Sequence, residues 1–208
     1  MRDNAYSFAQ SVASQIEALS RDEFFLRVGR SKRLQEELFP LSRLALHFAF
    51  PGLSVEVEAF ENNGPVDGHI SLRGYKTQDF DVEITYLRSH EDAMRGELLC
   101  TNNVTPGAGP IRRDKVTGEV IAEYGLIEHC ELIETIASSL IDLHAKKVVK
   151  TYPLGTVLLI AFDEVSLYGS SDWRKLYDHL ASKGGLAIGK FRAIYLFNCA
   201  TNELQTAA

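Results

Sequence analysis

The chain has 208 residues, of which 45% are hydrophobic and 24% charged, a composition sufficient for one well-filled core. Its formal net charge of −6 argues against a protein that coats nucleic acid nonspecifically, because phosphate binding needs a basic surface, although a local basic groove is compatible with this charge. The sequence lacks any run of ~18 apolar residues, and its first residues lack the basic-then-apolar form of a secretory signal, so we expect a cytoplasmic protein without a membrane partner. The three cysteines lie far apart in sequence, without the spacing of a disulfide framework or metal site, and we expect them to be reduced thiols: Cys100, Cys130 and Cys199.

The N-terminal part is predicted to be helical. Residues 4–19 place four apolar side chains on one stripe at helical spacing, with Asn4 available as the N-cap: Phe8, Val12, Ile16 and Leu19. A second helical stretch begins after Ser20 with acidic residues in its first turn. Pro40 is predicted to divide this stretch from a third helix over residues 41–48, because proline is tolerated in the first turn of a helix and not in its middle.

From residue 53 the hydrophobic period changes to two, which predicts a half-buried strand. Residues 62–65 have strong turn chemistry, and two further strands of about 68–74 and 79–87 are predicted to follow as a hairpin. In the second strand of this hairpin the side chains alternate between an apolar face and a polar one, which carries Asp79, Asp81, Glu83 and Thr85.

The rest of the chain is predicted to alternate helices with strands. In order, it contains a helix capped by Ser89, a long loop over 101–118, a helix over 126–150, a strand over 156–162, a helix opened by Ser170 and a strand over 191–197. The helix over 126–150 carries a stripe at spacings of three and four: Leu132, Ile133, Ile136, Leu140, Leu143 and Lys147. This order predicts an α/β fold with a mixed central sheet flanked by helices. We expect a single domain over 1–208, with an N-terminal helical segment at 1–50 and an α/β core at 51–200.

Charged residues of the two signs separate along the sequence. Acidic residues predominate between Glu56 and Glu83, whereas basic residues gather elsewhere: Arg112, Arg113, Lys115, Lys146, Lys147 and Lys150. Such a separation is compatible with an acidic metal site flanked by basic arms that hold a polyanion. Surface charge clusters are also commonly no more than solvated faces.

Two short segments carry a resemblance to a known family. Asp67 follows Pro65 and Val66 just before the first strand of the hairpin, and Asp81-Val82-Glu83-Ile84-Thr85 lies in the second. With the order helix, three strands, helix, strand over most of residues 40–198, they resemble the core of the PD-(D/E)XK nuclease superfamily. The resemblance implies a restriction-endonuclease-like αβββαβ core, hydrolysis of phosphodiester bonds, and DNA or RNA as a partner. In that family the two acids hold a divalent cation, and a lysine two residues after the second acid orients or activates the attacking water.

The sequence departs from the family motif, because its proline is not adjacent to Asp67 and the lysine is absent. If Glu83 is the second acid, Thr85 stands at the position of the lysine. If Asp81 is the second acid, Glu83 stands there, as in a minority of restriction enzymes. Three carboxylates, from Asp67, Asp81 and Glu83, would then surround a cation, and such hard oxygen donors suit Mg²⁺ or Mn²⁺. The resemblance therefore implies catalytic roles for these three acids and Thr85.

A basic residue from elsewhere would have to replace the missing lysine. Lys76 in the turn of the hairpin, Lys146 and Lys150 are the candidates. Together with Arg112 and Arg113 they are also the expected substrate-binding residues.

Other interpretations of the same residues stay open. Asp81 and Glu83 can be polar residues on a solvated strand face, with Asp67 as a turn former. Alternatively, the nuclease-like fold is retained without catalysis, as a module that binds nucleic acid or a protein partner. A small-molecule enzyme on another α/β sheet is a third class, but the sequence carries no cofactor signature for it.

Overall fold

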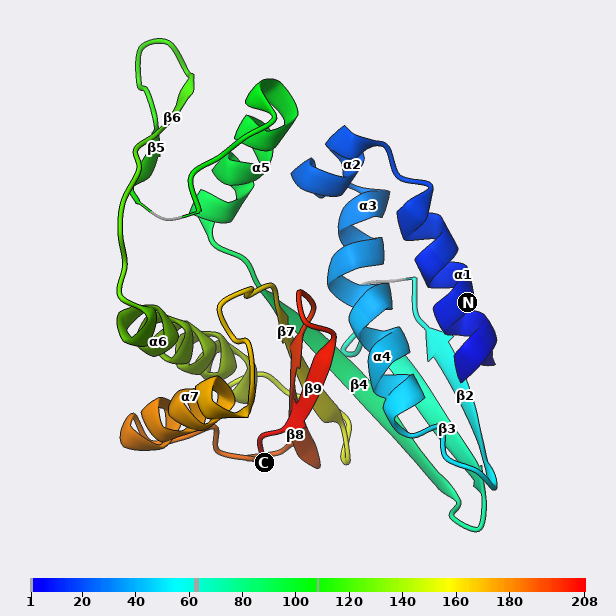
Figure 1. The fold of residues 1–208 in the computed structure, drawn as a ribbon. Helices are drawn as coiled ribbons and strands as arrows, with labels where there is room; N and C mark the ends of the chain where they lie inside the picture. Colours follow the sequence, from blue (N-terminus) through cyan, green and yellow to red (C-terminus); the bar gives the residue numbers. More distant parts are fainter. Residues whose placement is uncertain (1, 62–63, 108) are drawn as a thin grey trace.

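The structure, a computed structural model, describes residues 2–61, 64–107 and 109–208. A seven-stranded mixed sheet forms its centre, with the strand order β1-β2-β3-β4-β7-β8-β9. The strands are β1 (Arg2–Asn4), β2 (Leu53–Ala59), β3 (Gly68–Gly74), β4 (Gln78–Leu87), β7 (Val157–Phe162), β8 (Ala193–Asn198) and β9 (Glu203–Thr206). A separate hairpin of β5 (Ile111–Arg113) and β6 (Val120–Ala122) projects from the body (Figure 1).

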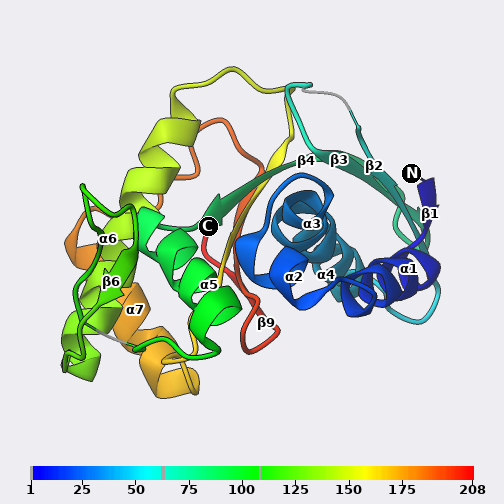
Figure 2. The same cartoon turned by 90° about the horizontal axis from the view of Figure 1, so that it is seen from above.

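Helices cover both faces of the sheet (Figure 2). One face carries α1 (Ala5–Glu17), α2 (Arg21–Leu26), α3 (Arg30–Arg33), the π-helical turn η1 (Leu34–Leu38) and α4 (Phe39–His47). The other carries α6 (His129–Val148) and α7 (Ser170–Ser182), while α5 (His90–Asn102) follows the carboxyl end of β4. The predicted class, an α/β fold with a mixed central sheet flanked by helices, is confirmed.

β4 is the strand at which the two halves of the sheet meet. Strands β1 to β4 pair in antiparallel fashion, whereas β4, β7 and β8 are parallel to one another, and β9 closes the far edge antiparallel to β8. The parallel pairing of β4 with β7 requires a crossover connection, and α6 lies in that connection.

Strand alternation sends the two faces of β4 into different surroundings. Phe80, Val82 and Ile84 lie in the apolar cluster formed with α1 and α4. Glu83 lies in register with Leu158 of β7, and Leu158 belongs to the second apolar cluster, which α6 and α7 cover. The acidic face of β4 is therefore the face turned toward α6.

Most of the predicted helix starts are confirmed. The side chain of Asn4 accepts a hydrogen bond from the backbone of Ser7 at the start of α1, and Ser20 and Ser89 begin α2 and α5 with capping boxes. The predicted helices over 126–150 and from Ser170 correspond to α6 and α7.

The prediction that Pro40 divides two helices is wrong. The chain passes from η1 into α4 without a break, and Pro40 lies in the first turn of α4. In η1 the backbone N–H of Phe39 bonds to the carbonyl of Leu34, five residues earlier. This wider turn shifts the hydrogen-bond ladder just before the proline, so that the missing N–H of Pro40 does not end the helix.

Other differences concern short strands. The segment predicted as a loop over 101–118 contains the end of α5 and the strand β5, which pairs with β6, and the short edge strands β1 and β9 carry too few residues for a period to be recognised. The strands predicted at about 68–74 and 79–87 are confirmed as β3 and β4. Of the predicted turn at 62–65, residues 62 and 63 lie outside the described residues.

Among the described residues, we find no helix of sufficient length and apolar character to cross a membrane.

Candidate active site

Backbone hydrogen bonds fix Asp67 beside the middle of β4. Its N–H donates to the carbonyl of Val82 (2.9 Å), and its own carbonyl accepts from the N–H of Phe60 (3.0 Å). Asp67 immediately precedes the paired residues Gly68 and Val82, so its antiparallel neighbour is Glu83. The first acid of the predicted motif and one candidate for the second acid are therefore cross-strand neighbours.

The carboxylate of Asp67 is held in an unfavourable electrostatic environment. Burial raises its pKa to about 6, and the negative charges of Glu83 and Glu37 act in the same direction. Two favourable interactions oppose this rise: Oδ2 accepts a hydrogen bond from the N–H of Ile84 (2.6 Å), and the ammonium of Lys147 lies near enough to act on the pKa. Such a site favours the arrival of a further positive charge.

Glu83 is bound to a lysine from the opposite layer. Its Oε1 atom lies 2.6 Å from Nζ of Lys147 in α6, and the side chains are only 10% and 16% exposed. The hydroxyl of Tyr152, in the loop after α6, donates to the same oxygen at 3.3 Å. The second oxygen of Glu83 has no hydrogen bond within the described part of the chain. The cluster therefore combines two carboxylates, one ammonium and one phenol.

Asp81 lies on the same face of β4 as Glu83 but is bound to a histidine instead of to this cluster. Its Oδ1 atom lies 2.7 Å from Nδ1 of His69, its partner in register on β3. Within the described residues, no group of three or more histidine, cysteine, aspartate or glutamate side chains is arranged to hold a metal ion. The expected convergence of Asp67, Asp81 and Glu83 around one cation is thus not formed there.

Thr85 lies one step further along the same face of β4 and is buried, with 7% of its surface exposed. It supplies no positive charge at the position where the family motif has its lysine.

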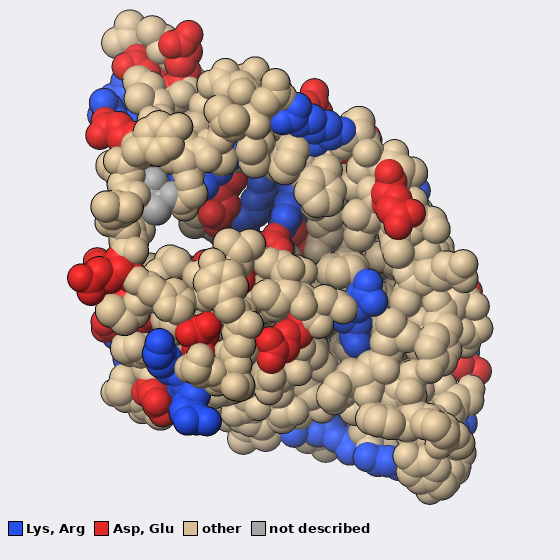
Figure 3. Space-filling view, in the orientation of Figure 1, with Lys and Arg blue, Asp and Glu red and all other residues tan. Residues whose placement is uncertain are grey.

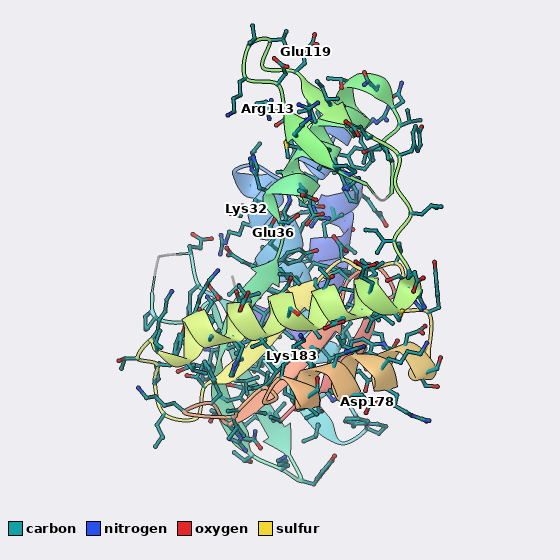
Figure 4. All side chains as sticks on the ribbon, turned by 90° about the vertical axis from the view of Figure 1, so that its left-hand side faces the viewer. Lys32, Glu36, Arg113, Glu119, Asp178 and Lys183 are labelled. Atoms are coloured by element: carbon teal, nitrogen blue, oxygen red, sulfur yellow. The ribbon has the colours of Figure 1, made fainter. Side chains whose placement is uncertain are left out.

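The basic residues expected to bind substrate lie on the surface. Lys76 is exposed in the turn between β3 and β4, and Lys146 and Lys150 are exposed on and just after α6. Arg112 and Arg113 lie on β5, which is part of the projecting hairpin, where Figure 4 labels Arg113. Arg113 is bound to Glu97 of α5 at 2.6 Å, whereas Arg112 has only a distant partner in Glu123, at 3.9 Å.

Sequence reasoning did not assign the basic residue that contacts the site. Lys76, Lys146 and Lys150 were the candidates, but the residue bound to Glu83 is Lys147. A signal was present, because Lys147 continues the apolar stripe of the helix toward the sheet, whereas Lys146 is exposed. Tyr152 and Glu37 reach the site from segments far away in sequence, and no spacing rule links them to Asp67.

The donor set fits one hard divalent cation. Mg²⁺ is commonly bound by one or two protein carboxylates, with water and substrate oxygens completing its shell. Asp67 and Glu83 provide two adjacent carboxylates whose mutual repulsion a cation would relieve. A cation there would compete with Lys147 for Glu83, so the ammonium would be released to interact with a bound anion.

Comparison of the chain with protein-family models, with curated proteins and with solved structures found no significant match.

Proposed function

We propose that the protein is a metal-dependent phosphodiesterase that acts on nucleic acid, with Asp67 and Glu83 as the cation ligands. The observation that carries the proposal is the pairing of these two carboxylates across β3 and β4, beside an ammonium from the crossover helix. The resemblance of the motif to the PD-(D/E)XK superfamily supports the same activity. It is also supported by the position of the site on β4, the junction between the antiparallel and parallel strands.

The side chains would divide the work as follows. Asp67 and Glu83 would hold Mg²⁺ or Mn²⁺, which would supply Lewis-acid activation of water and neutralise charge on the phosphate. Lys147 would take the role of the missing lysine and stabilise charge that develops on the phosphoryl oxygens. The hydroxyl of Tyr152 would keep Glu83 oriented toward Asp67. Asp81 and Thr85 would then have no direct contact with the cation.

The nucleic-acid partner is supported by charge placement. The projecting hairpin carries Arg112 and Lys115 as exposed cations, so it can contact a phosphate backbone despite the acidic net charge of the chain. All three cysteines are free thiols, a state that suits the reducing cytoplasm, where we place the protein.

The proposal is tested by incubating plasmid, single-stranded DNA and RNA with the protein in Mg²⁺ or Mn²⁺. We expect cleavage by the wild type, and a loss of about 10²-fold or more in Asp67→Asn and Glu83→Gln. Asp79→Asn is the matched control, because Asp79 is an exposed acid of β4 that is bound to Arg73 instead of the cluster. The proposal fails if a folded wild type cleaves none of these substrates, or if all three variants retain activity.

A second candidate function has its own supporting observation. Lys147 already neutralises Glu83, and the backbone N–H of Ile84 donates a hydrogen bond to Asp67, so the site can be stable without a cation. This arrangement suits a nuclease-like module that binds nucleic acid or a protein without cleavage. Nucleic-acid binding that is independent of Mg²⁺, together with an absence of cleavage, would identify this function.

A further inference from the structure

A cavity of about 250 Å³ lies at the carboxyl ends of the parallel strands β4 and β7, on the side of α2 and α5. Its charged lining residues are Arg27, Arg88, Arg95, Asp92 and Asp163. In the space-filling view a hollow with basic and acidic side chains at its bottom opens on this side of the molecule (Figure 3). The carboxyl ends of parallel strands are the usual place for ligands in α/β sheets.

The two acids that line the cavity are already satisfied by protein groups. Asp163 accepts hydrogen bonds from Arg27 (2.5 Å) and from the hydroxyl of Tyr86 (2.7 Å). Asp92 accepts from the backbone N–H of Ser89 (2.7 Å) as part of the capping box of α5. Neither carboxylate therefore needs a ligand, and neither dominates the charge of the cavity.

Arg88 is the group whose hydrogen-bonding capacity is poorly used. Its side chain is 17% exposed, and the contacts of its guanidinium to the carbonyls of Phe25 and Leu26 and to Oε1 of Glu36 are all 3.3 to 3.4 Å long. These distances exceed the usual range of about 2.7–3.2 Å for N–H···O bonds. Figure 4 labels Glu36, which also lies 3.9 Å from Lys32 and so divides its charge between two cations. A permanently charged, largely buried guanidinium with only long contacts is suited to accept an oxyanion.

The remaining walls are apolar and determine which oxyanion fits. Phe24, Phe25 and Leu99 line the cavity, and the rings of Phe24 and Phe25 meet edge to face at 5.4 Å. Phe24 is 39% exposed, so one apolar wall faces the opening. Sites for drug-sized ligands have volumes of ~300–1,000 Å³, and this cavity is smaller. It has room for a single ring with one charged group, and not for a dinucleotide.

We propose that this cavity is a binding site for a small ring-bearing oxyanion, a phosphate ester or a carboxylate. The oxyanion contacts Arg88, and the ring lies against Phe24 and Phe25. This site is separate from the Asp67 and Glu83 cluster, because it lies at the carboxyl end of β4, whereas Glu83 lies four residues before Leu87, and the two sites share no lining residue.

The test measures the binding of two probes, phenyl phosphate and benzoate, to the full chain by ligand-observed NMR and calorimetry. We expect saturable binding of at least one of them, tighter than that of inorganic phosphate, which lacks the ring, and of benzyl alcohol, which lacks the charge. The tighter of the two probes identifies the oxyanion. Absence of saturable binding of both probes overturns the proposal, as does equal affinity for inorganic phosphate or benzyl alcohol.

Variants assign the binding to the cavity. Arg88→Gln should lower the affinity for the probe by about tenfold or more, because a charge-assisted hydrogen bond is lost. Phe24→Ala changes an exposed wall and does not endanger folding. It should lower the affinity for the ring-bearing probe and leave the affinity for inorganic phosphate unchanged. Arg174→Gln, on the exposed face of α7, is the matched control and should bind as the wild type does.

Asp67→Asn should also leave the affinity unchanged, so failure of the proposed phosphodiesterase and failure of this site are distinguishable. Wild-type affinity in both Arg88→Gln and Phe24→Ala, or an equal loss in Arg174→Gln, would contradict the assignment.

Discussion

Asp67 is held next to a second carboxylate by main-chain bonds, so the folded chain keeps a negative charge in a place that disfavours it. The pKa of Asp67 rises from 3.8 to about 6 on folding, and the native state therefore binds more protons than the unfolded state between these values. Stability should decrease as the pH rises through this window, and the loss is complete above the native pKa. A loss of folding stability caused by a shifted pKa is typical of a site that binds a ligand.

The first prediction concerns this loss of folding stability, measured on protein that EDTA has freed of metal. Asp67→Asn should be more stable than the wild type at pH 8, by about 1 to 3 kcal/mol for a shift of this size in a partly exposed group. At pH 3 most of the difference should vanish, since Asp67 is then mainly protonated in both states. Urea unfolding at the two pH values measures this. A variant less stable than the wild type at pH 8 would show that the charge of Asp67 stabilises the fold.

The second prediction concerns Lys147. Lys147→Gln leaves Glu83 buried without its cation, which should lower stability by roughly 3 kcal/mol and cleavage by about 10²-fold. Combining it with Glu83→Gln should restore much of the stability and none of the activity. Lys146→Gln is the control, because Lys146 is the exposed neighbour on α6. Thermal unfolding and cleavage assays on the four proteins test this, and a loss in Lys146→Gln equal to that in Lys147→Gln would contradict the role.

Residue-level features divide into those that the sequence could predict and those that depend on the fold. Asp67 was identified by a short motif alone, and Glu83 by that motif together with the period of its strand. Glu37 and Tyr152 reach the site only through the packing of η1 and of the loop after α6, which leave no local pattern. Asp81 shares a strand face with Glu83, and the period of two does not predict that the carboxylate of Asp81 is bound to His69.

At the scale of elements, strong periodicity predicted the long helices and the buried strands. The prediction at Pro40 was wrong because it assumed α-helical hydrogen bonding, whereas η1 uses a wider turn. The strands β5 and β6 were missed because three residues each are too few for a period, within a segment rich in glycine and proline. These misses lie outside the β3 and β4 hairpin that positions the candidate site.

The third prediction belongs to the projecting hairpin. If it contacts a nucleic-acid backbone, replacing Arg112 and Lys115 together by glutamine should weaken binding. The slope of log affinity against log salt concentration should fall by the contribution of about two phosphate contacts. Arg113 is left in place, because its bond to Glu97 anchors the hairpin to α5. Affinity measured over a range of salt concentrations, with Lys183→Gln as control, tests this, because Lys183 lies at the end of α7, away from the hairpin (Figure 4). An unchanged salt slope would exclude the hairpin as a contact.

At the scale of the molecule, two different parts of the fold supply side chains to the site on β4. β4 receives Asp67 from the antiparallel side, and Lys147 from the helix that makes the parallel crossover possible. The sequence predicted the mixed sheet and the order of its inner strands along the chain, though not their order within the sheet. The apolar stripe of the crossover helix indicated that Lys147 faces the sheet, but the sequence could not show that this lysine meets Glu83 of β4.

The most direct measurement is Mn²⁺ binding at neutral pH by calorimetry on the wild type, Asp67→Asn, Glu83→Gln and the control Asp79→Asn. We predict one saturable site in the wild type and in Asp79→Asn, abolished or strongly weakened by each change in the carboxylate pair. A folded wild type that binds no Mn²⁺, or binding that survives the loss of both Asp67 and Glu83, would contradict the central claim.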